Sequence, residues 1–374
     1  MAKIDDSVKK KVPELRFKGF TDDWEERKLS TESTITAGGD IDKSKLKEVG
    51  EYPIFANALT NDGIVGYYDS SYRVEAPAVT VTGRGDVGNA KARKVNFTPV
   101  VRLLAVKSNH DVDFLENAIN NHKVLVESTG VPQLTAPQLG NYKIFFPTGE
   151  EQQKIGSFFK QIDDTIALHQ RKLAMLKELK QGYLQKLFPQ NGSKFPQLRF
   201  AGFADAWEQR KLGDITKIST GKLDANAMVE NGKYDFYTSG IKKYRIDVAA
   251  FEGPSITIAG NGATVGYMHL ADNKFNAYQR TYVLQEFLVD RSFIFSEIGN
   301  KLPKKIKQEA RTGNIPYIVM DMLTELKLSI PQNNSEQQKI GSFFKQLDYT
   351  IDLHQRKLDL LKEQKKGFLQ KMFI

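Results

Sequence analysis

The sequence predicts a tandemly duplicated protein of the mixed α/β (α+β) class, with two globular domains and two long helices. A segment at 151–188, beginning EQQKIGSFFKQ, returns at 336–373 with 29 of 38 positions identical. An opening segment at 11–29, KVPELRFKGFTDDWEERKL, returns as KFPQLRFAGFADAWEQRKL at 194–212. Between these repeats, short β-branched apolar runs end in glycine turns, which is typical of strands in a mixed domain.

The repeat that begins EQQKIG is predicted to form a long helix of the coiled-coil type, because its apolar residues recur at alternating steps of four and three. The apolar seam of the first copy contains Ile155, Phe159, Ile162, Ile166, His169, Leu173, Leu176 and Tyr183. The matching seam of the second copy contains Ile340, Phe344, Leu347, Ile351, His354, Leu358, Leu361 and Phe368. At about 1.5 Å per residue each helix would be roughly 55 Å long, too long for one small domain, so we expect it to be a spacer.

A capping box is expected at the start of each helix, from Thr148 to Glu151 and from Asn333 to Glu336. Trp24 and Trp207, in the opening segments, are expected to anchor each domain on its helix. Since all of these features occur twice, we expect two related half-molecules.

Polar residues interrupt the two seams at matching places. Histidine occupies one place in both copies, His169 and His354, and lysine occupies another, Lys180 and Lys365. If the helices pair in antiparallel fashion, the histidines would face each other. Such histidines are either hydrated positions that a long seam tolerates, or residues that fix the register of the pair.

The repeats divide the chain into six segments. They are a flexible N-terminal tail (1–10), a first domain (11–149), a first spacer helix (150–189), a linker (190–193), a second domain (194–332) and a second spacer helix (333–374).

The two variable regions, 30–147 and 213–331, share only a few landmarks. In the first a predicted strand at 78–82 leads into the turn GRGDVG, and in the second a strand at 255–259 leads into GNGATVG. Both regions end in a predicted strand followed by proline. The two helices have remained similar while the loops have diverged. This indicates a rigid frame that holds two domains which recognise different ligands.

Composition limits the class of protein. Lysine and arginine number 54 against 45 aspartates and glutamates, a net charge of +9, which favours an anionic partner. The chain has no cysteine, so disulfides and thiolate metal sites are excluded. We expect no signal peptide, because the first 15 residues lack an apolar core, and no membrane span. A soluble, cytoplasmic protein is expected.

Catalytic motifs are not recognised in the sequence. The glycine turns lack the Lys-Ser/Thr of a P-loop and the full G-x-G-x-x-G pattern, so we interpret them as tight turns rather than cofactor loops. The five histidines show no metal-ligand spacing. The Asn/Asp-Pro-Pro-aromatic tetrapeptide of an amino-methyltransferase and a nuclease-like carboxylate cluster were not found. We expect no catalytic residue, metal or cofactor in this chain.

Basic, amide and aromatic side chains follow the landmarks of both variable regions. Lysine and arginine hold phosphates in protein–DNA complexes, while arginine and amides read purine edges. Each basic cluster taken alone is more often a solvated face, but such clusters occur in both domains. The candidate DNA-binding residues are Asn57, Arg84, Asn89, Lys91, Arg93, Arg102, Gln133, Tyr237, Lys242, Lys243, Arg245, Asn261, Tyr267, Gln279, Arg280, Lys304 and Lys305.

The repeated motifs P-x-L-R-F-x-G-F-x-x-x-W-E-x-R-K-L and E-Q-Q-K-I-x-x-F-F, with D-x-T-I-x-L-H-Q-R-K-L, resemble the specificity subunit of type I restriction-modification enzymes from about residue 11 onward. The resemblance implies two target recognition domains, each reading half of a bipartite, asymmetric site in double-stranded DNA, held apart by an antiparallel pair of helices with pseudo-two-fold symmetry. It implies two modification subunits that dock on the helices and carry S-adenosylmethionine. It also implies restriction subunits that use ATP and Mg.

Three other interpretations stay open at this point. The chain could be a self-contained nuclease or methyltransferase, which activity of the chain alone would reveal. It could be a coiled-coil scaffold that never touches DNA, which salt-dependent DNA binding would exclude. It could also act as an alternate specificity subunit without a restriction partner.

Overall fold

A computed structural model describes residues 12–122, 131–190, 192–309 and 316–374. The chain forms two compact units, one of residues 1–170 with 356–374 and the other of residues 171–355. We call them unit 1 and unit 2. The long helices α4 (Gly149–Leu187) and α8 (Asn334–Met372) have 39 residues each. Each helix is divided between the two units, with one part in unit 1 and the other part in unit 2. The predicted pair of long helices is therefore present.

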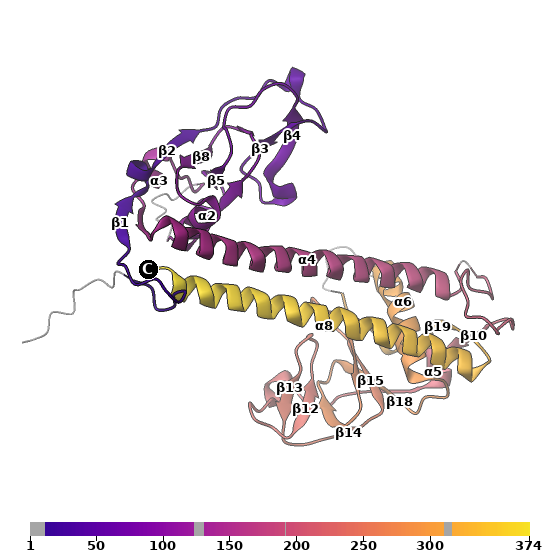
Figure 1. Ribbon diagram of the computed structural model, residues 1–374. Helices are drawn as coiled ribbons and strands as arrows, with labels where there is room; N and C mark the ends of the chain where they lie inside the picture. Colours follow the sequence, from indigo (N-terminus) through magenta and orange to yellow (C-terminus); the bar gives the residue numbers. More distant parts are fainter. Residues whose placement is uncertain (1–11, 123–130, 191, 310–315) are drawn as a thin grey trace, which may run out of the picture. The chain divides into compact units, whose positions relative to one another are not determined.

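Unit 1 is a mixed α/β domain (Figure 1). Its strands are β1 (Glu25–Lys28), β2 (Ser33–Ala37), β3 (Tyr52–Phe55), β4 (Ile64–Tyr68), β5 (Ala78–Thr82), β6 (Ala90–Arg93), β7 (Thr98–Pro99), β8 (Leu103–Ser108) and β9 (Lys143–Phe146). Its short helices are α1 (Leu29–Glu32), η1 (Lys43–Lys45), η2 (Thr60–Gly63), α2 (Val112–Asn121) and α3 (Ala136–Gly140).

Unit 2 repeats this order with some additions. Its strands are β10 (Glu208–Lys211), β11 (Lys217–Thr220), β12 (Tyr234–Tyr237), β13 (Tyr244–Ile246), β14 (Phe251–Glu252), β15 (Ser255–Ala259), β16 (Met268–Ala271), β17 (Lys274–Ala277), β18 (Thr281–Gln285) and β19 (Lys327–Ile330). Its helices are α5 (Leu212–Ile215), η3 (Ala225–Ala227), α6 (Arg291–Glu309) and α7 (Met320–Thr324).

The sheets of the two units share one topology. The order β2-β8-β5-β6 in unit 1 corresponds to β11-β18-β15-β16 in unit 2, and both sheets are antiparallel. A second sheet, β4-β3-β7 or β13-β12-β17-β14, contains a parallel pair in each case. The strand at 78–82 or 255–259 lies inside its sheet and is buried at every residue, as its apolar sequence predicts.

The long helices run antiparallel inside each unit. In unit 1 Phe158 of α4 contacts Phe368 of α8, with ring centroids 5.0 Å apart. Asp163, which follows Phe158 in α4, accepts a hydrogen bond at 2.7 Å from the ammonium of Lys365, which precedes Phe368 in α8. In unit 2 Tyr183 contacts Phe343 at 4.9 Å in the same way. Lys180 pairs there with Asp348, at 2.5 Å. Both seam lysines thus have a carboxylate on the opposite helix.

The predicted meeting of His169 and His354 stays a prediction, because one belongs to unit 1 and the other to unit 2. Residues of the predicted seams that reach the domain cores are buried. Ile155 and Phe159 belong to the core of unit 1, and Ile340 and Phe344 belong to that of unit 2. The other predicted seam residues are buried or half-buried.

The same ion pair between arginine and glutamate, which we call the clamp, fixes the start of each long helix. Arg16 of the opening segment donates two hydrogen bonds to the carboxylate of Glu151, at 2.7 and 2.8 Å, and Arg199 does the same to Glu336. Both glutamates are buried. The predicted capping boxes are therefore only half formed: the amide of Glu151 meets the hydroxyl of Thr148 at 3.5 Å, but the glutamate side chain is held by arginine. A bidentate ion pair outcompetes a local cap because both partners are charged.

The glutamine after each clamp residue ties the same helix to its domain. The amide nitrogen of Gln152 donates to the carbonyl of Pro147 at 2.8 Å, and its oxygen accepts from the backbone amide of Asp111 at 3.2 Å. Gln337 makes the same two bonds in unit 2, to Pro331 and Asp290. The repeated E-Q-Q motif thus positions each domain on its long helix.

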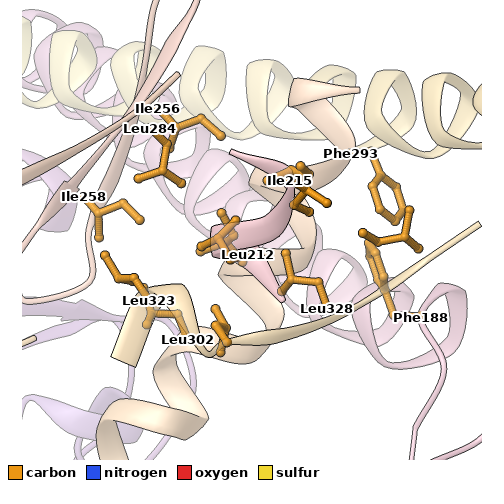
Figure 2. Packing of buried hydrophobic residues seen from close by; sticks show 14 of the residues in the cluster. Phe188, Leu212, Ile215, Ile256, Ile258, Leu284, Phe293, Leu302, Leu323 and Leu328 are labelled. Atoms are coloured by element: carbon orange, nitrogen blue, oxygen red, sulfur yellow. The ribbon is translucent and has the colours of Figure 1, made fainter. Parts of the chain in front are cut away.

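The tryptophans anchor the units as expected. Trp24 packs edge-on against Phe114 of α2 and Phe373, which follows α8, with centroids 6.0 and 6.2 Å apart. Trp207 contacts Phe188 and Phe293 in the same way. Figure 2 shows Phe188 beside Phe293, with the aliphatic residues of α5, α6, α7 and two sheets forming the core of unit 2.

Because Phe188 at the end of the first long helix is close in sequence to Lys194, the repeat predicts that the end of the second helix near Phe373 lies close to Lys11, a residue outside the described ones. The nearby Leu15 donates its amide to the carbonyl of Lys371 at 2.9 Å.

A carboxyl group lies inside the core of unit 2. Glu297 of α6 is fully buried, accepts from the amide of Ser329 in β19 at 3.1 Å and contacts the Asn300 amide at 3.2 Å. Lys301 approaches it to only 3.9 Å. Burial raises the pKa of Glu297 to about 7, because little of the lost hydration is replaced.

Candidate nucleic-acid interface

The glycine turns after β5 and β15 occupy the same place in both units. The carbonyl of Gly83 accepts from the amide of Leu134 at 2.9 Å, and the carbonyl of Gly260 accepts from that of Ile318 at 2.7 Å. A Cβ atom on Gly83 would lie 2.2 Å from the carbonyl oxygen of Arg102. On Gly260 it would lie 2.3 Å from that of Arg280. Only glycine permits this approach, so the two turns and the two arginines are structural counterparts.

In unit 1 four of the predicted residues come together around this turn. Arg102 donates from Nη1 to Oε1 of Gln133 at 2.6 Å, and Gln133 forms a β-bridge with Arg84. Asn57 accepts from the amide of Gly83 at 2.8 Å and donates to the carbonyl of Val101 at 3.1 Å. Arg84, Arg102 and Gln133 are exposed. The arrangement presents two guanidinium groups beside amide groups at one edge of the domain.

The backbone of Arg102 is unusual within this cluster. Its φ is 71°, in the left-handed region that favours glycine. A side chain held there against its steric preference costs about 1 kcal/mol or more and is characteristic of functional sites.

Unit 2 builds the equivalent edge with different side chains. Asn261 forms a β-bridge with Tyr317, and the Ser239 hydroxyl donates to the Asn261 side-chain oxygen at 2.5 Å. Gln279 donates its backbone amide to the carbonyl of Leu223 at 2.8 Å. Arg280 is exposed. Asparagine and tyrosine thus stand where unit 1 has Arg84 and Gln133.

A second group of predicted residues in unit 2 surrounds His269. The ammonium of Lys243 lies 5.3 Å from the centre of the Tyr237 ring, and Tyr267 packs edge-on to His269 at 4.9 Å. Burial raises the pKa of Tyr237 and lowers that of His269, so both rings are neutral at pH 7. Nearby, Lys242 lies over Tyr244 at 5.4 Å. Aromatic rings here orient the lysines at the surface.

Three predicted residues have structural partners that occupy their polar groups. Arg93 is buried, stacks on the Phe55 ring at 3.7 Å and donates to Asp62 at 2.5 Å. Arg245 donates to Asp235 and to two backbone carbonyls. Asn89 closes its own turn by donating to the carbonyl of Asp86 at 2.7 Å. The guanidinium groups of Arg93 and Arg245 thus stabilise their domains; Arg93 is buried, whereas Arg245 remains exposed, and a DNA contact by either stays a prediction.

The remaining candidates lie elsewhere. Lys91 is exposed on β6, Lys304 is exposed on α6, and Lys305 pairs with Glu309 one turn further along α6. The structure therefore does not bring these lysines into the edge formed by the glycine turns.

Sequence reasoning missed Tyr317 and Ser239. Tyr317 is 59% exposed and directly follows Pro316, as Gln133 follows Pro132. Ser239 ends the stretch that corresponds to Tyr52–Asn57. Both positions could have been found by aligning the two halves of the chain on these landmarks.

Within the described ranges, no three or more histidine, aspartate or glutamate side chains are placed so that they could hold a metal ion. The helices in the same part of the chain include none with the length and apolarity that a membrane crossing requires.

Comparison with known proteins identifies both halves. The sequence model of the type I restriction modification DNA specificity domain matches residues 21–178 and again 204–363. The specificity subunit of the EcoDI type I restriction enzyme of Escherichia coli is 34% identical over 164 residues, which are 44% of this chain and 36% of that protein. The MjaVIII specificity subunit of Methanocaldococcus jannaschii is 22% identical over 284 residues, or 66% and 65% of the two chains. The chain thus spans less than two thirds of these relatives.

A solved structure shows the same fold over almost the whole chain. The S subunit of a type I restriction-modification system from M. genitalium matches with a TM-score of 0.77 at 18% identity, covering 97% of this chain and 99% of that one. This match confirms the duplicated α/β fold, and the two matches to the family model confirm the resemblance inferred from the motifs. The chain belongs to the family of type I restriction modification DNA specificity domains and carries two of them in tandem.

Proposed function

We propose that this chain is the specificity subunit of a type I restriction-modification complex and recognises a bipartite sequence in double-stranded DNA, one half through each unit. One observation supports this most strongly. The two units have the same backbone around their glycine turns, yet carry arginine and glutamine in one case and asparagine and tyrosine in the other. A shared frame with unlike exposed side chains is what two readers of different sequences need.

The proposed complex also contains two modification subunits. Each unit offers them a similar surface where the opening segment crosses a long helix. In unit 2 an open groove is lined by Met175, Leu179, Gly182, Tyr183 and Leu198, among others. In unit 1 the counterparts Leu15 and Leu360 are 40% and 51% exposed. Exposed apolar side chains at equivalent places support docking of two copies of one partner.

The methylation and cleavage of DNA would be carried out by the partner subunits. The modification subunits would carry S-adenosylmethionine, and restriction subunits would use ATP and Mg, so this chain would bind no cofactor and catalyse no reaction. The complex would act in the cytoplasm, where it meets DNA. Activity of the purified chain alone, with a methyl donor or a metal supplied, would overturn this assignment.

The long helices would set the distance between the two half-sites, about one helical turn or roughly 10 base pairs from centre to centre. Deleting residues 170–176 and 355–361 removes one heptad from each helix without changing the phase of its seam. Each helix shortens by about 10 Å, which corresponds to roughly 3 base pairs of DNA. We expect the spacer of the recognised site to shorten accordingly. An unchanged spacer would refute the role of the helices as a ruler.

Mapping methylated adenines in a host genome tests the function itself. Cells that express the chain with its modification subunit should gain one bipartite methylated motif that is missing when the chain is omitted. A scaffold that never binds DNA would leave methylation unchanged. DNA binding by the purified complex should also weaken steeply with salt, because phosphate contacts release counterions.

A further inference from the structure

We propose that Arg102, oriented by Gln133, reads a guanine in the half-site contacted by unit 1, rather than holding a phosphate. This inference rests on the proposed function and names a base contact within it. Arginine that donates two hydrogen bonds to O6 and N7 of guanine is the most common specific contact in the major groove.

The contact with Gln133 leaves a usable fork on Arg102. Oε1 of Gln133 accepts from Nη1 at 2.6 Å, and the side chain of Arg102 is otherwise exposed. A guanidinium has five N–H donors in one plane, so a pair of parallel donors stays open after this bond. The bond also fixes the plane in which that pair lies. Such a fixed pair of parallel donors matches the two acceptors, O6 and N7, at the edge of a guanine.

The backbone of Arg102 gives a second, independent reason. Among the described non-glycine residues, φ is positive only at Asn61, Asp62, Arg102 and Glu286. Asparagine and aspartate tolerate this region, but arginine does not share that tolerance. Glycine would fit at position 102 with less strain, so the presence of arginine there indicates a use for its side chain.

The comparison of the two units gives a third reason. Arg280 is the counterpart of Arg102, but Tyr317 stands where unit 1 has Gln133. The described residues provide no hydrogen bond to the side chain of Arg280. A side-chain hydrogen bond therefore orients Arg102 in unit 1, whereas the described residues provide none for its counterpart Arg280 in unit 2. A phosphate contact common to both half-sites gives no reason for this difference, whereas a base contact that differs between them does.

The test uses the purified complex of the full chain with its modification subunits, and a duplex that carries the methylated motif. Each base pair of the motif is replaced in turn, and competition binding gives the preference at every position. For the native complex we expect one guanine, in the unit 1 half, at which replacement weakens binding roughly 10- to 100-fold.

Three variants separate a base contact from a phosphate contact. Arg102→Gly relieves the backbone strain, so the protein should fold, and the preference for that guanine should disappear. Arg102→Lys keeps the charge but has no planar fork, and it should lose the preference as well. Gln133→Ala should weaken the preference at the same position only. The matched variant Arg280→Ala should leave the unit 1 half unchanged and affect the other half.

Two results would overturn the inference while leaving the proposed function intact. In one, Arg102→Gly weakens binding to every duplex by the same factor and Arg102→Lys restores it, which is the behaviour of a phosphate contact. In the other, Arg102→Gly changes nothing. A native complex without any sequence preference would overturn both the inference and the proposed function.

Discussion

Replacing Glu297 by glutamine removes a carboxyl group from the core of unit 2 while keeping its shape. In the native protein this group accepts from the amide of Ser329 at 3.1 Å and contacts Asn300 at 3.2 Å. A glutamine oxygen can accept the first bond, and its amide can donate to the side-chain oxygen of Asn300. The substitution therefore tests the cost of the buried charge with little change in packing.

The direction of the effect follows from the pKa of Glu297. Burial raises it from an ordinary value of 4.5 to about 7 in the folded protein. Below pH 4.5 the group is neutral in both the folded and the unfolded chain, and it costs nothing. As the pH rises toward 7 the unfolded chain ionises first, so the free energy of unfolding decreases. Above pH 7 the loss is constant at about 3 kcal/mol.

Urea denaturation of the full chain at pH 5.5 and pH 8 measures this loss. We expect Glu297→Gln to stabilise unit 2 by about 1 kcal/mol at pH 5.5 and by about 3 kcal/mol at pH 8. Glu230→Gln, at an exposed side chain of unit 2, serves as the control and should give the same small effect at both pH values. A gain from Glu297→Gln that does not grow with pH would refute the reasoning about its burial.

Four further substitutions test the duplicated frame, each by denaturation of the full chain. Glu151→Ala leaves Arg16 without its partner in a largely buried site and should destabilise unit 1 by about 3 kcal/mol. Glu336→Ala should do the same in unit 2. A loss below about 1 kcal/mol would show that the ion pair between arginine and glutamate contributes little. Gly83→Ala places a Cβ atom 2.2 Å from the carbonyl of Arg102 and should cost about 2 kcal/mol, so unchanged stability would contradict the close approach. Asp163→Asn weakens a half-exposed ion pair with Lys365. The substitution should lower the free energy of unfolding by no more than about 1 kcal/mol at low salt, and by less at high salt. A loss of several kcal/mol that does not depend on salt would contradict a half-exposed ion pair.

The long helices were predictable because their signal is local and repeated. Steps of four and three from Ile155 to Leu187 define a helix whatever it packs against. The strand at 78–82 was predictable for the same reason, since five small or β-branched residues precede a glycine. The clamp of Arg16 on Glu151 was not, because its partners are 135 residues apart and nothing in a single sequence pairs them. The local capping box therefore looked complete when it was not.

The interface was only partly predictable. A count of basic residues finds Arg93 and Arg102 equally well, but it cannot tell that Arg93 points toward Phe55 and Asp62 inside the domain. Position along a strand decides this, because side chains alternate between faces. Arg102 and Gln133 were proposed separately, and only the fold brings them to within 2.6 Å. Tyr317 was missed because its counterpart becomes evident only when the two units are compared.

If each unit reads its own half of one DNA site, an exchange of domains should change the recognised sequence. Residues 213–331 are replaced by a second copy of residues 30–147, and methylated adenines are mapped in cells that also express the modification subunit. We expect a new motif made of two copies of the half-sequence that unit 1 reads. Retention of the original asymmetric motif by the exchanged chain would contradict it.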